Sequence, residues 1–216
     1  SIVEWRPFKE SGGQLRINGL VKNTSLKGIF QSFQNFNQNE LTDKNLSGNL
    51  HANGEIRIDF NWEFDILYEN ILADIEFKVK DGNLINFKTL DALRRFTEVE
   101  KLSNIKFGEL TNRVRIANKM IIIPEMTLEN SALTLKVEGT NGFDGKMNFL
   151  IQMQLRELLG NKKTIRSKRL DDFIKEKNNQ EKVWIPLRMT GYPENIKFSI
   201  DTCLLYTSPS PRDSGK

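Results

Sequence analysis

The stretch Met147-Asn148-Phe149-Leu150-Ile151-Gln152-Met153-Gln154-Leu155-Arg156 decides the fold class of this chain. Every second side chain in it is apolar, and most of those between are polar. Successive side chains of a β-strand point to opposite faces, so this period of two predicts a strand with one apolar face and one wet face. Such strands are typical of antiparallel sheets, because parallel strands are buried on both faces and form continuous apolar runs.

The same alternation recurs along most of the chain, and one continuous apolar run, Met120 to Ile123, departs from it. The other apolar rows are Leu15 and Ile17; Ile56, Ile58 and Phe60; Ile75, Phe77 and Val79; Val114 and Ile116; Leu133, Leu135 and Val137; and Ile196, Phe198 and Ile200. Each row predicts a strand that is buried on one side.

Turn-forming residues separate these rows. Asp81-Gly82 predicts a hairpin between Val79 and Leu84, and Pro124 can interrupt a ladder at an edge or a bulge. The other turn signals are Asn53-Gly54, Asn141-Gly142, Asp144-Gly145 and Gly191-Tyr192-Pro193. Because hairpins that follow one another in sequence build a meander, we expect one over most of the chain.

Three segments follow a helical rather than a strand period. Residues 89–102 carry an apolar side chain at every third position from Leu90 onward, and residues 167–177 form a charged, amphipathic segment. A shorter helix is expected around Ile29 to Phe36. The fold class that we predict is mainly β with minor α, namely a curved antiparallel meander sheet with one or two short helices packed at its face or end.

The end of the chain is set apart from this domain. The string from Cys203 to Asp213 resembles a translated sequencing adapter, so we expect the natural sequence to stop near Thr202 and residues 203–216 to be a non-native, disordered tail. Residues 1–202 then form a single β-rich fragment. Cys203 is the sole cysteine of the chain, so disulfides and cysteine metal sites are not expected.

The charges argue against a nucleic-acid binder. The formal net charge is +4, and the charged residues are scattered along the chain. The densest basic segment, Lys162 to Arg169, is followed at once by Asp171 and Asp172, which indicates a solvated face.

Residues that could support catalysis, or bind a metal or cofactor, are sparse. His51 is the only histidine, and we expect it to be an exposed residue at a strand end. The chain contains no nucleophile elbow, zinc-protease motif, phosphate-binding loop or dinucleotide fingerprint. Glu63 and Asp65 lie among aromatic residues, and strand alternation puts both on the wet face. We therefore expect no enzyme and no cofactor, with a glycan-active site at Glu63 and Asp65 as the weakest alternative.

Two apolar rows are the candidate contact surface. They pack either against the helix expected at 89–102 or against a lipid or protein partner. An exposed apolar surface usually marks an interaction site, and the adaptable methionine side chain suits irregular partners. The residues are Leu133, Leu135, Val137, Met147, Phe149, Ile151, Met153 and Leu155.

Several short segments between about Leu15 and Asp201 follow one another in a characteristic order, although no single one of them is diagnostic. The segments are Phe33 to Gln38, Leu41 to Gly48, Val79 to Leu90, Ile105 to Leu110, Ile122 to Met126, Asn130 to Leu133, Gly142 to Asp144, Leu158 to Lys162 and Val183 to Asp201. Their order resembles the C-terminal region of AsmA-like proteins of the Bacteroidetes type.

This resemblance implies a periplasmic β-rich protein with an N-terminal inner-membrane anchor and a role in outer-membrane biogenesis. Residues Ser1 to Trp5 contain neither an initiator methionine nor a secretory pattern, so we expect the anchor upstream. Relatives are viewed as carriers of phospholipid along an apolar groove, and the family supplies no catalytic residues. The expected function is a segment of a lipid-transfer or outer-membrane assembly scaffold. The alternative is a structural or protein-binding β-domain without a lipid groove.

Overall fold

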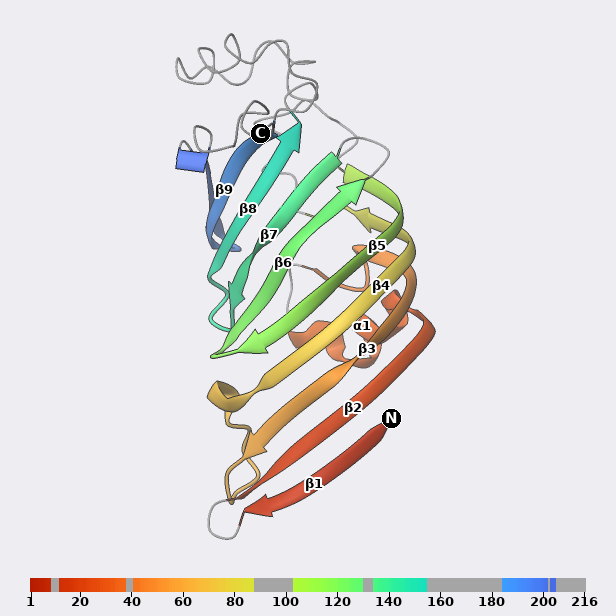
Figure 1. The fold of residues 1–216 in the computed structure, drawn as a ribbon, viewed down its shortest axis with the longest axis vertical. Helices are drawn as coiled ribbons and strands as arrows, with labels where there is room; N and C mark the ends of the chain where they lie inside the picture. Colours follow the sequence, from red (N-terminus) through yellow and green to blue (C-terminus); the bar gives the residue numbers. More distant parts are fainter. Residues whose placement is uncertain are drawn as a thin grey trace, which may run out of the picture.

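The computed structural model describes residues 1–8, 12–37, 41–87, 103–129, 134–154, 184–201 and 203–204. They form one antiparallel sheet whose ten strands follow one another in sequence order, curved and unclosed (Figure 1). The predicted fold class is therefore confirmed. The strands are β1 Ile2–Phe8, β2 Gly12–Ser25, β3 Leu46–Phe60, β4 Leu72–Ile85, β5 Asn104–Ala117, β6 Met120–Glu129, β7 Thr134–Gly142, β8 Met147–Gln154, β9 Trp184–Tyr192 and β10 Asn195–Ile200.

Helical structure follows β2 and lies beside β3 (Figure 1). Helix α1, Leu26–Ser32, begins where the Ser25 hydroxyl accepts a hydrogen bond from the Gly28 amide at 3.2 Å. The 3-10 helices η1, Gln34–Asn37, and η2, Tyr68–Asn70, are single turns. The short helix predicted around Ile29 to Phe36 is thus confirmed, whereas those predicted at 89–102 and 167–177 lie outside the described residues.

The strand register places the apolar rows of all ten strands on one face, called here the apolar face. Ile17 of β2 lies opposite Val3 and Ile56, and the pairing continues in the same sense to β10. The remaining cross-strand partners on this face include Ile75 with Val114, Ile116 with Ile121, Leu128 with Leu135, Val137 with Ile151, Ile151 with Leu187, and Leu187 with Ile200. The apolar face is therefore continuous across the sheet, because the apolar row of each strand lies beside that of the next strand.

Two of the predicted turns are in fact inside strands. Asn53-Gly54 lies in the middle of β3, and Asp81-Gly82 lies within β4, so neither makes a hairpin. Gly54 is required by close packing, since a Cβ there would collide with the Asp74 carbonyl oxygen of β4 and come within 2.7 Å of the Ile75 Cα. Asp81 adopts a φ of 51°, which gives a bulge instead of a turn.

The bulges lie in one band across the sheet. Asn23 in β2, Gly48 in β3 and Asp81 in β4 all have positive φ, and the register shifts beside Asn23 and Gly48. Bulges bend the strands that contain them. The band lies toward the ends of β2 to β5 at which these strands curl strongly (Figure 1). In β6 the register shifts between Ile123 and Met126, which is a bulge at Pro124, where an interruption of the ladder at an edge or a bulge was expected.

The predicted turns at Asn141 to Gly145 and at Gly191 to Pro193 are confirmed as the β7–β8 and β9–β10 hairpins. The β5–β6 hairpin turns through Asn118 and Lys119, whose φ angles of 52° and 58° match a type I′ turn. Because alternate connections of a meander lie at the same end of the strands, these three turns and the β3–β4 connection share one rim of the sheet (Figure 1).

The paired residues Gly19 and Gly54 provide a test of this packing. Gly54→Ala should lower the free energy of unfolding by about 2 kcal/mol or more, because the added methyl group meets the backbone of β4. Its register partner Gly19 has nothing within 4 Å of a built Cβ, so Gly19→Ala should change stability by less than about 0.5 kcal/mol. Urea unfolding followed by circular dichroism measures both, and equal losses would contradict the close approach of β3 and β4.

Candidate functional site: the apolar face of the sheet

The sheet joins the two predicted contact rows into one surface. In the register, Leu135 lies opposite Met153 and Val137 lies opposite Ile151, so β7 and β8 present these rows to the same side. Phe149 faces Gly139 and Met189, and Met147 begins the row at the hairpin. The structure therefore brings together Leu135, Val137, Met147, Phe149, Ile151 and Met153, whereas Leu133 and Leu155 lie outside the described residues.

These rows are the most buried part of the apolar face. Leu135 and Met153 are each 1% exposed, and Ile151 is 4% exposed. They pack in one cluster with Ile185 and Leu187 of β9, which are fully buried. The predicted contact of these rows with a lipid or partner stays a prediction, because their burial shows packing within this chain.

Toward β1 the apolar face becomes open. Val3 is 62% exposed and Trp5 is 46% exposed, although both continue the row formed by Ile17 and Leu15. The interpretation of the sequence missed these two residues, yet the alternation of Val3 and Trp5 with Glu4 and Arg6 contained the signal. The face is thus buried at β7–β9 and around Val79 of β4 and Ile105 of β5, and it is accessible at β1.

Aromatic rings are concentrated at the β1 end of the apolar face. The Trp5 ring lies over Gly13, where a Cβ would collide with it. The Trp5 and Phe60 ring centroids are 5.8 Å apart, and the Phe64 ring stacks on Trp5 at 6.0 Å with an interplanar angle of 24°. These separations are within the range of favourable aromatic pairs. The exposed β1 end of the apolar face therefore contains a cluster of three aromatic rings with Trp5 at its centre.

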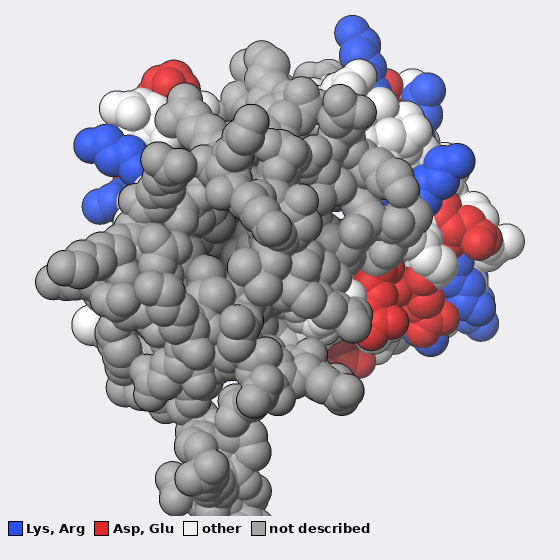
Figure 2. Space-filling view, turned by 90° about the horizontal axis from the view of Figure 1, so that it is seen from above, with Lys and Arg blue, Asp and Glu red and all other residues white. Residues whose placement is uncertain are grey.

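The opposite face contains cross-strand ion pairs. Arg113 binds both carboxylate oxygens of Asp74 and holds the pKa of that carboxyl below its ordinary value. Lys78 lies 2.8 Å from Glu109 and likewise lowers its pKa. Further pairs among the described residues are Arg16 with Glu55, Lys136 with Glu125, and Arg188 with Asp201. Figure 2 shows basic and acidic side chains interleaved along the side of the molecule, as expected for a solvated surface.

The polar residues considered for catalysis are not brought together. His51 lies within β3 and is half-buried, so its prediction as an exposed strand-end residue was wrong. Glu63 and Asp65 are exposed, and they belong to the β3–β4 connection rather than to a strand. Asn61 accounts for this, because its side-chain oxygen accepts hydrogen bonds from the amides of Glu63 and Asp65 and folds the segment into a tight turn.

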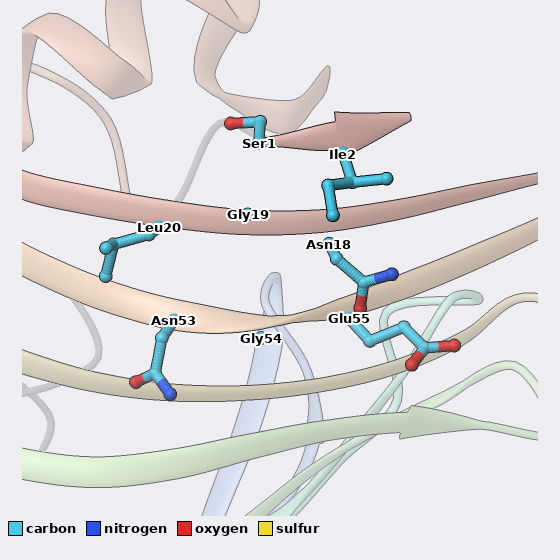
Figure 3. Close-up of a pocket in the computed structure, with 8 residues that line it drawn as sticks. All are labelled: Ser1, Ile2, Asn18, Gly19, Leu20, Asn53, Gly54 and Glu55. Atoms are coloured by element: carbon cyan, nitrogen blue, oxygen red, sulfur yellow. The ribbon is translucent and has the colours of Figure 1, made fainter. Parts of the chain in front are cut away.

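A shallow hollow of about 490 Å³ lies at the edge of the sheet (Figure 3). It forms where β1 begins, since Ile2 pairs with Asn18 and the second half of β2 continues past it. Ile2, Leu20 and the facing Gly19 and Gly54 border it, and Glu55 at its margin pairs with Arg16 at 3.1 Å. The hollow is thus a notch in the sheet edge, whose polar lining consists of Ser1, Asn18, Asn53 and Glu55.

The part of the chain that the structure describes contains no group of three or more His, Cys, Asp or Glu side chains able to hold a metal ion. No helix in that part is long and apolar enough to cross a membrane. Comparison with protein-family models, curated proteins and solved structures found no match. The resemblance to AsmA-like proteins therefore stays a prediction from the sequence.

The Arg188–Asp201 pair predicts a pH dependence of stability. Two guanidinium nitrogens of Arg188 donate to one Asp201 oxygen, at 3.3 and 2.7 Å, and hold the pKa of Asp201 below its ordinary value. A carboxyl with a lowered pKa stabilises the fold above its unfolded pKa of about 3.9, and this stabilisation is lost as the pH falls through the folded pKa. Asp201→Asn should therefore cost about 1 kcal/mol at pH 7 and progressively less below pH 4.

Thermal unfolding of the wild type and of Asp201→Asn at a series of pH values measures this difference. Glu194→Gln in the same hairpin is the matched control, because it removes an exposed carboxylate from the turn. A difference between wild type and Asp201→Asn that does not change with pH would contradict a stabilising role for the ionised Asp201 carboxylate.

Proposed function

We propose that this chain is part of a non-enzymatic envelope-biogenesis protein of the AsmA-like type, whose apolar face holds lipid acyl chains. In the full-length protein this segment lies in the periplasm and is anchored to the inner membrane by an upstream segment. The observation that carries the proposal is the single apolar face that runs through all ten strands.

The open β1 end of the apolar face supports this proposal. Val3 and Trp5 remain exposed there, and an exposed apolar surface of this kind marks an interaction site.

The dimensions also suit lipid. Ten strands at a spacing of about 4.8 Å extend roughly 43 Å across the sheet when curvature is ignored. That distance exceeds the roughly 30 Å of a bilayer hydrocarbon core. The opposite face contains ion pairs along β2 to β5, so acyl chains would be held there on the apolar side of the sheet only.

A structural or protein-binding β-domain is the second candidate, and the burial of the β7–β9 cluster favours it. Met153 and Leu187 are sealed by their neighbours, so this portion of the face has no room for a ligand. The two candidate functions make different predictions for the apolar side chains of β2 to β5, which are mostly half-buried. These side chains contact lipid in the first candidate and do not in the second.

A photo-crosslinking experiment separates these candidates. Val114 lies on the apolar face opposite Ile75, and the adjacent Arg115 lies on the ion-paired face. A photoreactive amino acid at Val114, in the chain exported to the periplasm of a Gram-negative host, should give phospholipid adducts detectable by mass spectrometry. The same group at Arg115 should give few, because that position faces water.

Ile58 on β3 and its neighbour Arg57 supply a second matched pair. Adducts at neither apolar position, in a protein whose circular dichroism shows a folded sheet, would exclude the lipid-holding function and leave the structural domain.

A further inference from the structure

Exposed apolar side chains gather on one rim of the sheet. Seven of the twelve large hydrophobic residues exposed in the described part of the chain lie in, or next to, the turns that join β3 to β4, β5 to β6, β7 to β8 and β9 to β10. These turns share one end of the strands (Figure 1). The seven residues, called here the aromatic rim, are Trp62, Phe64, Ile66, Tyr68, Met120, Phe143 and Tyr192.

The most exposed members of the aromatic rim are held on a rigid turn. Trp62 is 73% exposed and Phe64 is 70% exposed. The Asn61 amide donates to the Asp65 carbonyl at 3.0 Å, and the Phe64 amide donates to the Asn61 carbonyl at 3.1 Å. Phe64 has a φ of 65°, a conformation that bulky residues rarely adopt. The hydrogen-bonded turn therefore presents Trp62 and Phe64 at the surface, and Phe64 also stacks on Trp5.

The aromatic rim is continuous with the apolar face. Phe64 stacks on Trp5, and Trp5 belongs to the exposed β1 end of that face. An isolated bridge between Phe60 and Ile66 holds the turn against the end of β3. The rim therefore extends the apolar surface to the tips of the turns.

The charges around the aromatic rim are predominantly acidic. The four turns contain exposed carboxylates at Glu63, Asp65, Glu69, Asp144 and Glu194, against the ammonium groups of Lys119 and Lys146. Lys119 lies 3.5 Å from Glu69, which compensates one of these charges. This excess of acid opposes an anionic lipid surface and is compatible with a zwitterionic one.

We propose that the aromatic rim docks onto the interface of a zwitterionic lipid bilayer, with the strand ends pointing at the membrane. This inference rests on the proposed lipid-holding function and adds the site at which the sheet meets its lipid source. Tryptophan and tyrosine rings are favoured at the membrane–water interface, where one end is apolar and the other is wet. The row from β3 to β10 covers about 34 Å at a strand spacing of about 4.8 Å, which fits an extended flat target better than a small ligand.

Vesicle binding tests the proposal on the full chain. The chain should co-sediment with phosphatidylcholine vesicles, and its tryptophan emission should shift to shorter wavelength as Trp62 leaves water. Trp62→Ser combined with Phe64→Asn should weaken binding about tenfold or more, because the two most exposed rings are lost. Asn tolerates the positive φ at position 64, so the turn is preserved.

Leu20→Ser is the matched control. Leu20 is 57% exposed but lies within β2, away from the aromatic rim, and its replacement should leave vesicle binding unchanged. Replacing part of the phosphatidylcholine by phosphatidylglycerol should weaken binding of the wild type, given the acidic turns. Melting curves of each variant check that the sheet is intact.

Three results would overturn the proposal. They are an absence of vesicle binding by the wild type, equal binding by the rim variant and Leu20→Ser, and self-association that the rim variant abolishes without any vesicle binding. The last result would assign the rim to a second copy of the chain. Lipid adducts at Val114 together with unchanged binding of the rim variant would refute the docking surface alone and leave the proposed function in place.

Discussion

The alternation of side chains between two faces, kept in step across every strand pair, is the constraint on which the rest of this structure depends. A slip of one residue in any pair would move a whole row from the apolar face to the ion-paired face. The bulges follow the same constraint. In β4 the residues on the apolar face are odd-numbered up to Val79 and even-numbered from Gly82. In β5 the same switch occurs between Phe107 and Leu110, which pair with Gly82 and Val79, so the apolar faces of the two strands stay matched. Phe107 then lies directly over Gly82, which has no side chain to obstruct it.

Much of the fold could be predicted from the sequence because the period of two is local. The errors at Asn53-Gly54 and Asp81-Gly82 share one cause. Glycine, asparagine and aspartate provide positive φ or close approach both in hairpins and inside strands, and only the neighbouring strand shows which applies. The hairpin at Asn118-Lys119 was missed for the converse reason, since its second residue lacks the usual glycine.

The candidate site was predictable in its parts and not in its extent. The apolar rows of β7 and β8 can be read from the sequence. That they form one face with the rows of the other eight strands can be seen only once the pairing register of the strands is known. The segment Trp62 to Ile66 alternates like a strand, yet the hydrogen bonds of Asn61 make it a turn whose rings face outward. Alternation therefore gave the right face for Ile58, whereas for Glu63 it gave the right exposure but the wrong element, because side-chain hydrogen bonds to the backbone override periodicity over a few residues.

The sequence-ordered arrangement of the strands has an evolutionary consequence. Each inner strand pairs only with the strands that precede and follow it in the chain. Duplication or deletion of one hairpin would therefore alter a single junction, while every other pair keeps its partner, much as repeat proteins gain or lose units. Each added hairpin would lengthen the sheet by about 10 Å and leave the remaining strand pairs unchanged.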